Sequence, residues 1–427
     1  MNGQDKAGVD VTTPTDPAGS TRDAAPLMSP AVIFRRFWLA TTVSGLGSAV
    51  TLVALPLVAL IVLDASVIEV TLLTAAGHVG WLVLGLPAGV IVQRYPLRGL
   101  QVTMDLVRFA AICSIPLAWW LGVLTYAQLL VVALIVGFAR VLFDIGSLTF
   151  LPAIVEKKEL NARNSLISGT HAVNQTGGPS VGALIVQAMG PVVALLLDAI
   201  SYLVSALTLR TLPEPGASGN SQVKPVQLIK EGWTFVVRHA VMGPCLWWAT
   251  ATNFFSTALI ALTPVYLVRA AETPPATVGF VLAMDGLGAV IGSAVATRLA
   301  RRLGTARTLI VASVAGGLIA LVIPFTTSLD TIYFFMIGNA GLSAGVVIGS
   351  ILTRTYRQTE SPPELLSRVM ATTRFVSWGA IPLGAAISGL VADSIGLHPA
   401  LWLVCAGTLV APLILLLSPL RSRRDFG

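Results

Sequence analysis

The sequence predicts an all-α membrane protein made of two six-helix lobes, and two observations carry that prediction. The 427 residues are 55% hydrophobic and 11% charged, with a mean hydropathy of +0.82, whereas a soluble domain carries about a quarter charged residues. Six long apolar segments also lie on each side of a polar stretch at 211–238. A plan repeated around a polar hinge is typical of proteins whose halves rock against each other during transport.

Twelve segments are long enough to cross a bilayer, which requires roughly 20 apolar residues in a helix. They cover residues 37–63, 69–92, 100–121, 126–150, 165–188, 191–209, 241–268, 277–299, 308–325, 331–353, 369–392 and 399–417. We therefore predict a disordered tail at 1–30, a first bundle at 31–210, a linker at 211–240, a second bundle at 241–420 and a basic tail at 421–427. The first tail lacks the basic start and apolar core of a cleaved signal peptide.

Basic residues predict the orientation of these segments. If the N-terminus is inside, the loops and helix ends on the cytoplasmic side hold many lysines and arginines, whereas the opposite loops hold only Arg269. This asymmetry follows the positive-inside rule. We expect a multi-pass protein of the plasma membrane with an even number of spans and both termini, linker and basic tail included, in the cytoplasm.

The two halves also echo each other in sequence. Gly177 and Gly182 correspond to Gly379 and Gly384 at one common shift, because 379 − 177 and 384 − 182 both equal 202. The correspondence favours the fifth and eleventh spans as repeat partners.

Several short motifs follow one another in an order and spacing typical of one family. Residues 89–98, Gly-Val-Ile-Val-Gln-Arg-Tyr-Pro-Leu-Arg, follow the second span, Asp-Leu-Val-Arg at 105–108 opens the third, and Leu-Asp-Ala-Ile-Ser-Tyr at 197–202 lies in the sixth. Further pieces lie at 151–152, 159–165, 231–233 and 363–369. Over nearly its whole length the chain resembles a major facilitator superfamily transporter, of the enterobactin-exporter and macrolide-efflux type of drug and siderophore exporters. The resemblance implies twelve transmembrane helices in two pseudo-symmetric bundles of six.

The first of these motifs departs from the superfamily signature G-x-x-x-D-R-x-G-R. Gln93 stands at the position of the signature's aspartate, and Pro96 stands at the position of its second glycine. A carboxylate that would pair with neighbouring cations is therefore absent. Either different partners hold the cytoplasmic gate of this chain, or its branch of the family tolerates a looser gate.

Charged residues around the third and fourth spans are the candidates for that gate. At 1.5 Å per residue, Asp105 lies about 8 Å into its span and Asp144 roughly 10 Å into its own, so both acids are expected near Arg94 and Arg98. We predict that an Arg94–Asp144 latch stabilises the outward-facing state. The alternative is that Asp144 pairs only with Arg140, four residues earlier on the same helix face. The candidate gate residues are Gly89, Arg94, Arg98, Asp105, Arg108, Arg140 and Asp144.

The fifth span contains a second feature of the resemblance. Gly178, Pro179 and Gly182 match the exporter motif G-x-x-x-G-P-x-x-G-G, while Asn174 and Ala183 replace its first and last glycines. Glycine permits close helix contact and proline removes a backbone donor, so the segment is a candidate pivot. Glycine and proline are also simply frequent in membrane helices. The resemblance favours export over import.

Two acids inside the spans are the candidates for proton coupling. Asp198 and Asp285 lie within apolar segments and have no opposite charge at helical spacing. Intramembrane carboxyl groups are costly and mark proton relays. The alternatives are that a cation on another helix satisfies each acid, or that each lies near an interface and is always ionised.

Polar and aromatic residues of other spans are candidates for a substrate cavity. Interhelical hydrogen bonding is the competing explanation for the amides, and interface anchoring for many of the aromatics. The cavity candidates are His171, Asn174, Gln175, Asn253, Phe254 and Arg374.

No nucleotide-binding G-x-x-x-x-G-K, zinc-binding HExxH or G-x-S-x-G motif occurs in the sequence, and the three cysteines have no CxxC spacing. We therefore expect a protein that is not an enzyme, with no cofactor, no metal and no nucleic-acid partner.

The sequence thus favours a monomeric secondary transporter in the lipid bilayer that exports a small, largely apolar molecule in exchange for protons. Two alternatives remain open. One is uptake by symport of substrate and protons on the same scaffold. The other is a membrane sensor or assembly factor that has kept the fold and lost transport.

Overall fold

The computed structural model describes residues 28–85, 87–156, 159–214 and 233–426, and within these ranges the chain is helical without a strand. The first half contains α1 (Pro30–Leu57), the π-helical turn η1 (Val58–Val62), α2 (Val67–Leu84), α3 (Ala88–Arg94), α4 (Leu97–Trp120), α5 (Tyr126–Ile154), α6 (Leu160–Met189) and α7 (Pro191–Arg210). The second half contains α9 (Met242–Val265), the π-helical turn η2 (Tyr266–Ala270), α10 (Ala276–Leu303), α11 (Thr305–Ala320), η3 (Ile323–Phe325), η4 (Leu329–Thr331), α12 (Ile332–Glu360), α13 (Pro363–Ile395), α14 (Leu397–Gly407), α15 (Val410–Leu416) and η5 (Pro419–Ser422).

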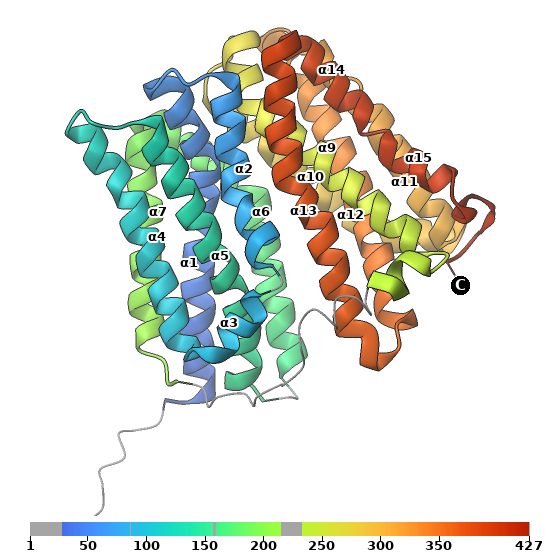
Figure 1. Cartoon of the computed structure of the whole chain (residues 1–427), viewed down its shortest axis with the longest axis horizontal. Coiled ribbons are helices and arrows are strands. Elements are labelled where there is room, and N and C mark those ends of the chain that lie inside the picture. The colour runs from blue at the N-terminus through green and yellow to red at the C-terminus, as the bar shows by residue number, and fades with distance from the viewer. Residues whose placement is uncertain (1–27, 86, 157–158, 215–232, 427) are drawn as a thin grey trace, which may run out of the picture.

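These helices form two lobes side by side, with α1 to α7 in the first lobe and α9 to α15 in the second (Figure 1). Within the described ranges, eleven helices are long and apolar enough to cross a membrane. The remaining long helix, α6, has 30 residues, enough to cross a bilayer, but is too polar in its first two thirds to be counted with the eleven; we include it as the twelfth. Taking α2 with α3, and α14 with α15, as single broken spans gives six in each lobe. The predicted fold class is therefore confirmed.

Of the segment predicted as the basic tail at 421–427, the described residues 421–426 pack against the second lobe. The backbone N–H of Ala306 donates to the carbonyl of Arg424 at 3.1 Å, and the Phe426 ring meets the Tyr356 ring edge-on at 5.1 Å. Residues 1–27 and 215–232 of the predicted tail and linker lie outside the described residues. The predicted lobe boundaries at 30, 210, 240 and 420 stay predictions.

The internal repeat is visible in the backbone. The first span of each lobe ends in a π-helical turn, followed by an acidic residue with positive φ, Asp64 at 48° and Glu272 at 50°. Single glycines with φ of 81° and 91°, Gly190 and Gly396, join the last two spans of each lobe. A side chain at these two glycine positions would be strained. The lobes are therefore two copies of one plan, as the sequence echo predicted.

The apolar core distinguishes the two ends of the molecule. We call the end that carries Arg98 at the start of α4 and Arg210 at the end of α7 the basic end, and the opposite end the far end. In the half toward the far end, one cluster of buried apolar residues runs through both lobes, from Leu57 and Leu195 to Leu262 and Leu401. Toward the basic end, separate clusters belong to the first lobe and to the second.

Two helix crossings join the lobes, and small residues allow both. On α10, a Cβ at Gly279 would collide with Ala183 of α6. On α13, a Cβ at Gly389 would collide with Thr71 of α2. From these crossings the ribbons of the two lobes diverge toward the basic end (Figure 1). Since backbones can approach this closely only without side chains, the two glycines permit the observed arrangement of the lobes.

We predict that Gly279→Ala weakens the α6–α10 crossing, because the added methyl group overlaps Ala183. Gly177→Ala on α6 is the matched control, since a Cβ there meets nothing within 4 Å. Spin labels at the exposed far-end residues Val123 and Leu329 report the separation of the lobes. Longer label distances are expected for Gly279→Ala and unchanged distances for the control. Identical distributions in both variants would show that this contact does not set the lobe arrangement.

Candidate functional site

A buried ion pair lies inside the first lobe. Asp105 and Arg108 are three residues apart on α4, and the guanidinium Nη2 donates to Oδ1 of Asp105. Their side chains are 0% and 3% exposed. The guanidinium also lies against the Phe143 and Tyr202 rings, at 4.3 and 4.4 Å from their centroids. These cation–π contacts replace part of the hydration that Arg108 loses on burial.

Asp198 on α7 extends this buried pair into a cluster. Its carboxylate accepts hydrogen bonds from Thr51 of α1 and, at 3.2 Å, from Ser201 of α7. Arg108 acts on Asp198 electrostatically from α4, the cation on another helix that was the alternative for this acid. A Cβ at Gly47 of α1 would collide with both Asp198 and Ser201, so a glycine is needed where α1 passes this cluster.

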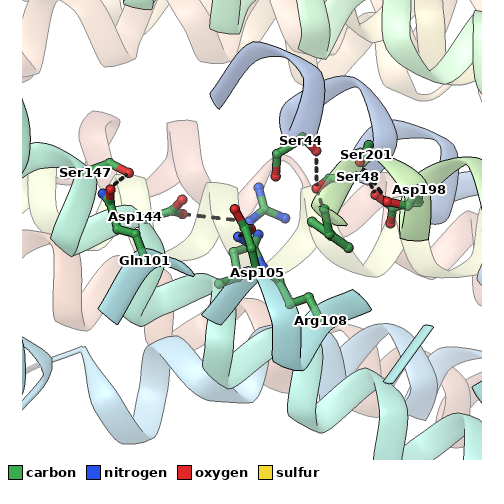
Figure 2. Close-up of polar contacts among 11 residues, drawn as sticks. Ser44, Ser48, Gln101, Asp105, Arg108, Asp144, Ser147, Asp198 and Ser201 are labelled. Carbon is green, nitrogen blue, oxygen red and sulfur yellow. Dashed lines mark hydrogen bonds and ion pairs between the residues drawn. The ribbon is translucent and has the colours of Figure 1, made fainter. Parts of the chain in front are cut away.

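The cluster contains more acid than base. Figure 2 shows Asp105 between the Gln101–Ser147 pair and the group formed by Asp198 and Ser201. Two carboxylates and one guanidinium sum to a charge of −1 when all are ionised. Within the described part of the chain, Asp105 Oδ2 and Arg108 Nε have no hydrogen-bond partner. Uncompensated buried charge is costly, so the cluster can accept one proton without recruiting another cation.

The predicted gate residues have different surroundings in the structure. Asp105 is fully buried and pairs with Arg108, because its side chain enters the lobe interior. Its nearness to Arg94 and Arg98 stays a prediction. Arg98 binds the segment after α7, with Nε 3.3 Å from Oε2 of Glu214 and Nη1 donating to the Leu212 carbonyl at 2.8 Å.

Asp144 pairs with Arg140 on its own helix in this structure, at 3.8 Å and with both side chains partly exposed. Arg94 is exposed at the end of α3. The Arg94–Asp144 latch therefore stays a prediction for the outward-facing state. Gly89 and Gln93 belong to α3, and their surroundings lie outside the described residues.

A cluster of aromatic rings and an arginine lies where α2 meets α13. The Arg374 guanidinium of α13 lies 4.1 Å from the Trp378 centroid and 5.0 Å from the centroid of Trp81 on α2. The two indoles meet edge-on at 4.6 Å. Arg374 therefore bridges the lobes through cation–π contacts and is also exposed. Trp378 was not singled out by sequence reasoning, although its position four residues after Arg374 on one helix face was a usable signal.

Charged side chains from three helices act on one another near this contact between the two lobes, which we call the seam. Asp144 of α5 acts electrostatically on His171 of α6 and on Arg374 of α13. His171 is exposed. The structure thus brings together two of the predicted cavity residues, Arg374 and His171, with two of the predicted gate residues, Arg140 and Asp144.

The two asparagines have interhelical partners. Asn174 donates from α6 to the Thr42 carbonyl of α1 at 3.1 Å, and Asn253 donates from α9 to the Ser377 carbonyl of α13 at 2.8 Å. Hydrogen bonding between helices, the competing explanation, therefore accounts for both. The Phe254 ring packs edge-on against Phe255. The side chain of Gln175 lies outside the described residues.

The predicted pivot residues lie on α6 where it passes between α1 of its own lobe and α10 of the other lobe. Gly178 and Gly182 face Ala49 and Val50 of α1, while the Pro179 carbonyl and Ala183 face Gly279 of α10. The motif therefore serves two close helix contacts, one with each lobe, on neighbouring faces of α6. A pivoting role for Pro179 stays a prediction.

Asp285 differs from Asp198, although sequence reasoning treated the two acids alike. Asp285 of α10 is exposed, and no ion pair is formed by it among the described residues. Ser343 of α12 donates to its backbone carbonyl at 2.6 Å. Of the two proton-coupling candidates, Asp198 is the one that is completely inaccessible, whereas Asp285 is exposed on α10.

One ion pair between the lobes was missed by sequence reasoning. Arg269 of η2 donates from Nη2 to Oδ1 of Asp64, the positive-φ residue after η1, at 2.7 Å. The isolated position of Arg269 among the far-end loops was a usable signal. Pairing with Asp64 requires the two lobes to be placed side by side.

Two lobes of six helices, joined at small-residue crossings and carrying charged groups inside the spans, define a major facilitator transporter rather than an enzyme. The comparisons agree, because residues 21–425 match the family model MFS_3, described as transmembrane secretion effector. The chain belongs to this family.

The chain is also similar to individual proteins. It is 24% identical over 372 residues to the multidrug efflux pump Tap of Mycolicibacterium fortuitum, covering 84% of this chain and 89% of Tap. Its fold matches the nucleoside transporter NupG with a TM-score of 0.72 at 11% identity, over 92% of this chain and 99% of NupG. A bacterial homologue of the iron transporter ferroportin in its inward-facing state matches with a TM-score of 0.72 at 15% identity, over 93% and 100%.

We predict that Arg108→Met lowers the free energy of unfolding by about 3–5 kcal/mol, because it leaves buried carboxylates without their cation. Adding Asp105→Asn should recover part of that loss. Arg140→Met is the control, since its pair with Asp144 is partly exposed and contributes about 1 kcal/mol or less. Denaturant unfolding in mixed micelles measures all of these variants. A double variant less stable than Arg108→Met alone would contradict the assignment of Asp105 as its partner.

Proposed function

We propose that this transporter exports a small amphiphilic or hydrophobic compound, such as a drug, antibiotic or siderophore, by alternating access. The observation that carries the proposal is the division of the apolar core, which is continuous through both lobes at the far end and separate at the basic end. An apolar core that is shared by both lobes at one end and divided at the other is what a two-lobed carrier requires in one of its two states. The likeness to Tap, a multidrug efflux pump, supports the outward direction.

The orientation we propose places the basic end and both termini in the cytoplasm of a plasma-membrane protein, because membrane loops rich in arginine and lysine stay inside. The structure then represents an inward-facing state. The pair Asp64–Arg269 and the crossings at Gly279 and Gly389 are its closed extracellular side. The Arg94–Asp144 latch would belong to the opposite state.

Proton coupling is proposed for the buried cluster in the first lobe. Asp198 of α7 contacts Thr51 of α1, and Arg108 links it electrostatically to Asp105 on α4. A proton gained or lost there changes the charge among three helices of one lobe. Such a change can favour one packing of these helices over another, which is how a local charge event reaches a two-state element.

The substrate surface we propose lies at the seam between the lobes. Trp81 and Trp378 offer apolar ring faces, while Arg374, His171 and Asp144 offer charge. Aromatic faces beside a few polar groups suit an amphiphilic molecule. We infer that a monomer suffices, since one chain supplies both lobes of the seam.

Inverted membrane vesicles with an imposed pH gradient test the function. Fluorescent dyes of cationic, neutral and anionic amphiphilic type should accumulate inside vesicles that contain the protein, driven by an acidic interior. Release that depends on the gradient would instead indicate uptake by symport. The absence of flux for every dye, together with a stable, correctly inserted protein, would favour a sensor or assembly factor on the same fold.

In that assay, we predict that Asp198→Asn abolishes accumulation driven by the pH gradient while dye exchange without a gradient persists, because the amide cannot take up the coupled proton. Asp285→Asn is measured in parallel as the second candidate carrier. Asp425→Asn, at a partly exposed acid outside the spans, controls for general loss of charge. Unchanged pH dependence in both intramembrane variants would exclude the two aspartates as proton carriers.

The latch is predicted to show as non-additivity between Arg94 and Asp144. Arg94→Ala and Asp144→Ala should each slow export, and the double variant should be no slower than the slower single variant, because the second change removes an already unpaired charge. Initial rates of dye transport give the cycle. Additive losses for Arg94 and Asp144, with non-additivity for Arg140 and Asp144 alone, would leave only the pair seen on α5.

A further inference from the structure

A groove opens on the outer face of the first lobe, away from the seam. It lies between α4 and α7, which form the edge of the molecule farthest from the second lobe (Figure 1). Its volume is about 580 Å³, and its lining includes Arg98, Val102, Thr103, Leu106, Leu207 and Arg210. Because α4 and α7 are spans at the edge of the bundle, this groove faces the membrane rather than the transport path.

The groove is charged at one end and apolar along its length. Arg98 and Arg210 lie at the basic end, and Leu106 and Leu207 lie farther along the same two helices, 43% and 54% exposed. From residue 98 to residue 106 a helix rises about 12 Å. The groove therefore extends from the depth of lipid headgroups into the depth of acyl chains.

The charge at the mouth of the groove is positive. Arg210 is exposed and has no ion-pair partner within the described ranges. Arg98 is paired with Glu214, and Arg36 lies close by, donating from Nη1 to Thr211 at 2.9 Å. Three arginines and one glutamate at this place give a net positive charge. Clusters of this kind between transmembrane helices on the cytoplasmic side attract anionic headgroups.

We propose that this groove binds an anionic phospholipid of the cytoplasmic leaflet, with its phosphate at Arg210 and Arg98 and one acyl chain along Leu106 and Leu207. The proposal rests on the proposed orientation, which places the basic end in the cytoplasm. It does not rest on the direction of transport or on proton coupling.

The groove shares its two helices with the buried cluster. Leu106 follows Asp105 on α4, and α7, which carries Asp198, supplies Ala206 and Leu207 to the lining. The lipid therefore packs on the outer side of the two helices that carry the cluster. An acyl chain between α4 and α7 changes their separation and hence the distance from the Asp105–Arg108 pair of α4 to Asp198 of α7. Anionic lipid would therefore regulate the carrier from outside its transport path.

Native mass spectrometry of the delipidated full-length protein tests the site without requiring transport. Phosphatidylglycerol and phosphatidylcholine with identical acyl chains are titrated separately. Arg210→Gln should weaken binding of phosphatidylglycerol about fivefold, the loss expected for one arginine near a headgroup, and leave phosphatidylcholine unchanged. Arg301→Gln is the matched control, an exposed arginine at the basic end of the second lobe.

Leu207→Trp provides a second variant in case Arg210→Gln misfolds, since the larger ring fills the groove and should remove the tight phosphatidylglycerol site while the thermal midpoint is kept. Equal affinity of the wild-type protein for both lipids would overturn the proposal, as would an equal effect of Arg210→Gln and Arg301→Gln. Displacement of phosphatidylglycerol by inorganic phosphate at a similar concentration would also overturn it, because the acyl chain would then contribute nothing.

Discussion

Close contact between small residues of opposite lobes is the interaction on which the arrangement of this molecule depends. Ala183 against Gly279 and Thr71 against Gly389 let two pairs of helices cross at backbone distance. Inside a bilayer, apolar burial gives helices little reason to associate, so van der Waals contact at such crossings supplies much of the attraction. The ion pair Asp64–Arg269 and the ring contacts of Arg374 then form between lobes that are already aligned.

The two lobes share a backbone plan but not a chemistry. Both have a π-helical turn before a positive-φ acid, and both join their last two spans through a glycine with positive φ. Among the described residues, the cluster of Asp105, Arg108 and Asp198 belongs to the first lobe: α4 carries Asp105 and Arg108, whereas residues 308–320 of α11, its counterpart, include no charged residue. The first lobe therefore contains an enclosed ion pair that its structural counterpart on α11 lacks.

The charged cluster lies close to the membrane-facing surface of the first lobe, because only the width of one helix separates them. The same two helices, α4 and α7, present polar side chains inward and an arginine-ended groove outward. A helix is only about 10 Å wide, so events on its two sides are mechanically linked. The groove and the charged cluster thus lie on different sides of the same two helices.

Much of the fold could be predicted from the sequence, because its determinants are local along the chain. Apolar length gives the spans, the polar stretch at 211–238 separates the lobes, and matching glycines such as Gly177 and Gly379 reveal the repeat. Intramembrane charges such as Asp198 also stand out on composition alone, since an acid in an apolar segment is costly and needs a reason.

The partners of those charges were decided by the tertiary structure. The spacing of Asp105 gave its depth but not the burial that pairs it with Arg108, and nothing near Arg269 in the sequence points to Asp64, which lies on the other lobe. Asp198 and Asp285 look alike as isolated acids, yet one is enclosed and the other exposed. The sequence by itself determined where the helices run, because hydrophobicity and turn preference act residue by residue. Which side chains meet depended on the rotation and placement of whole helices, a property that emerges only when all of them pack together.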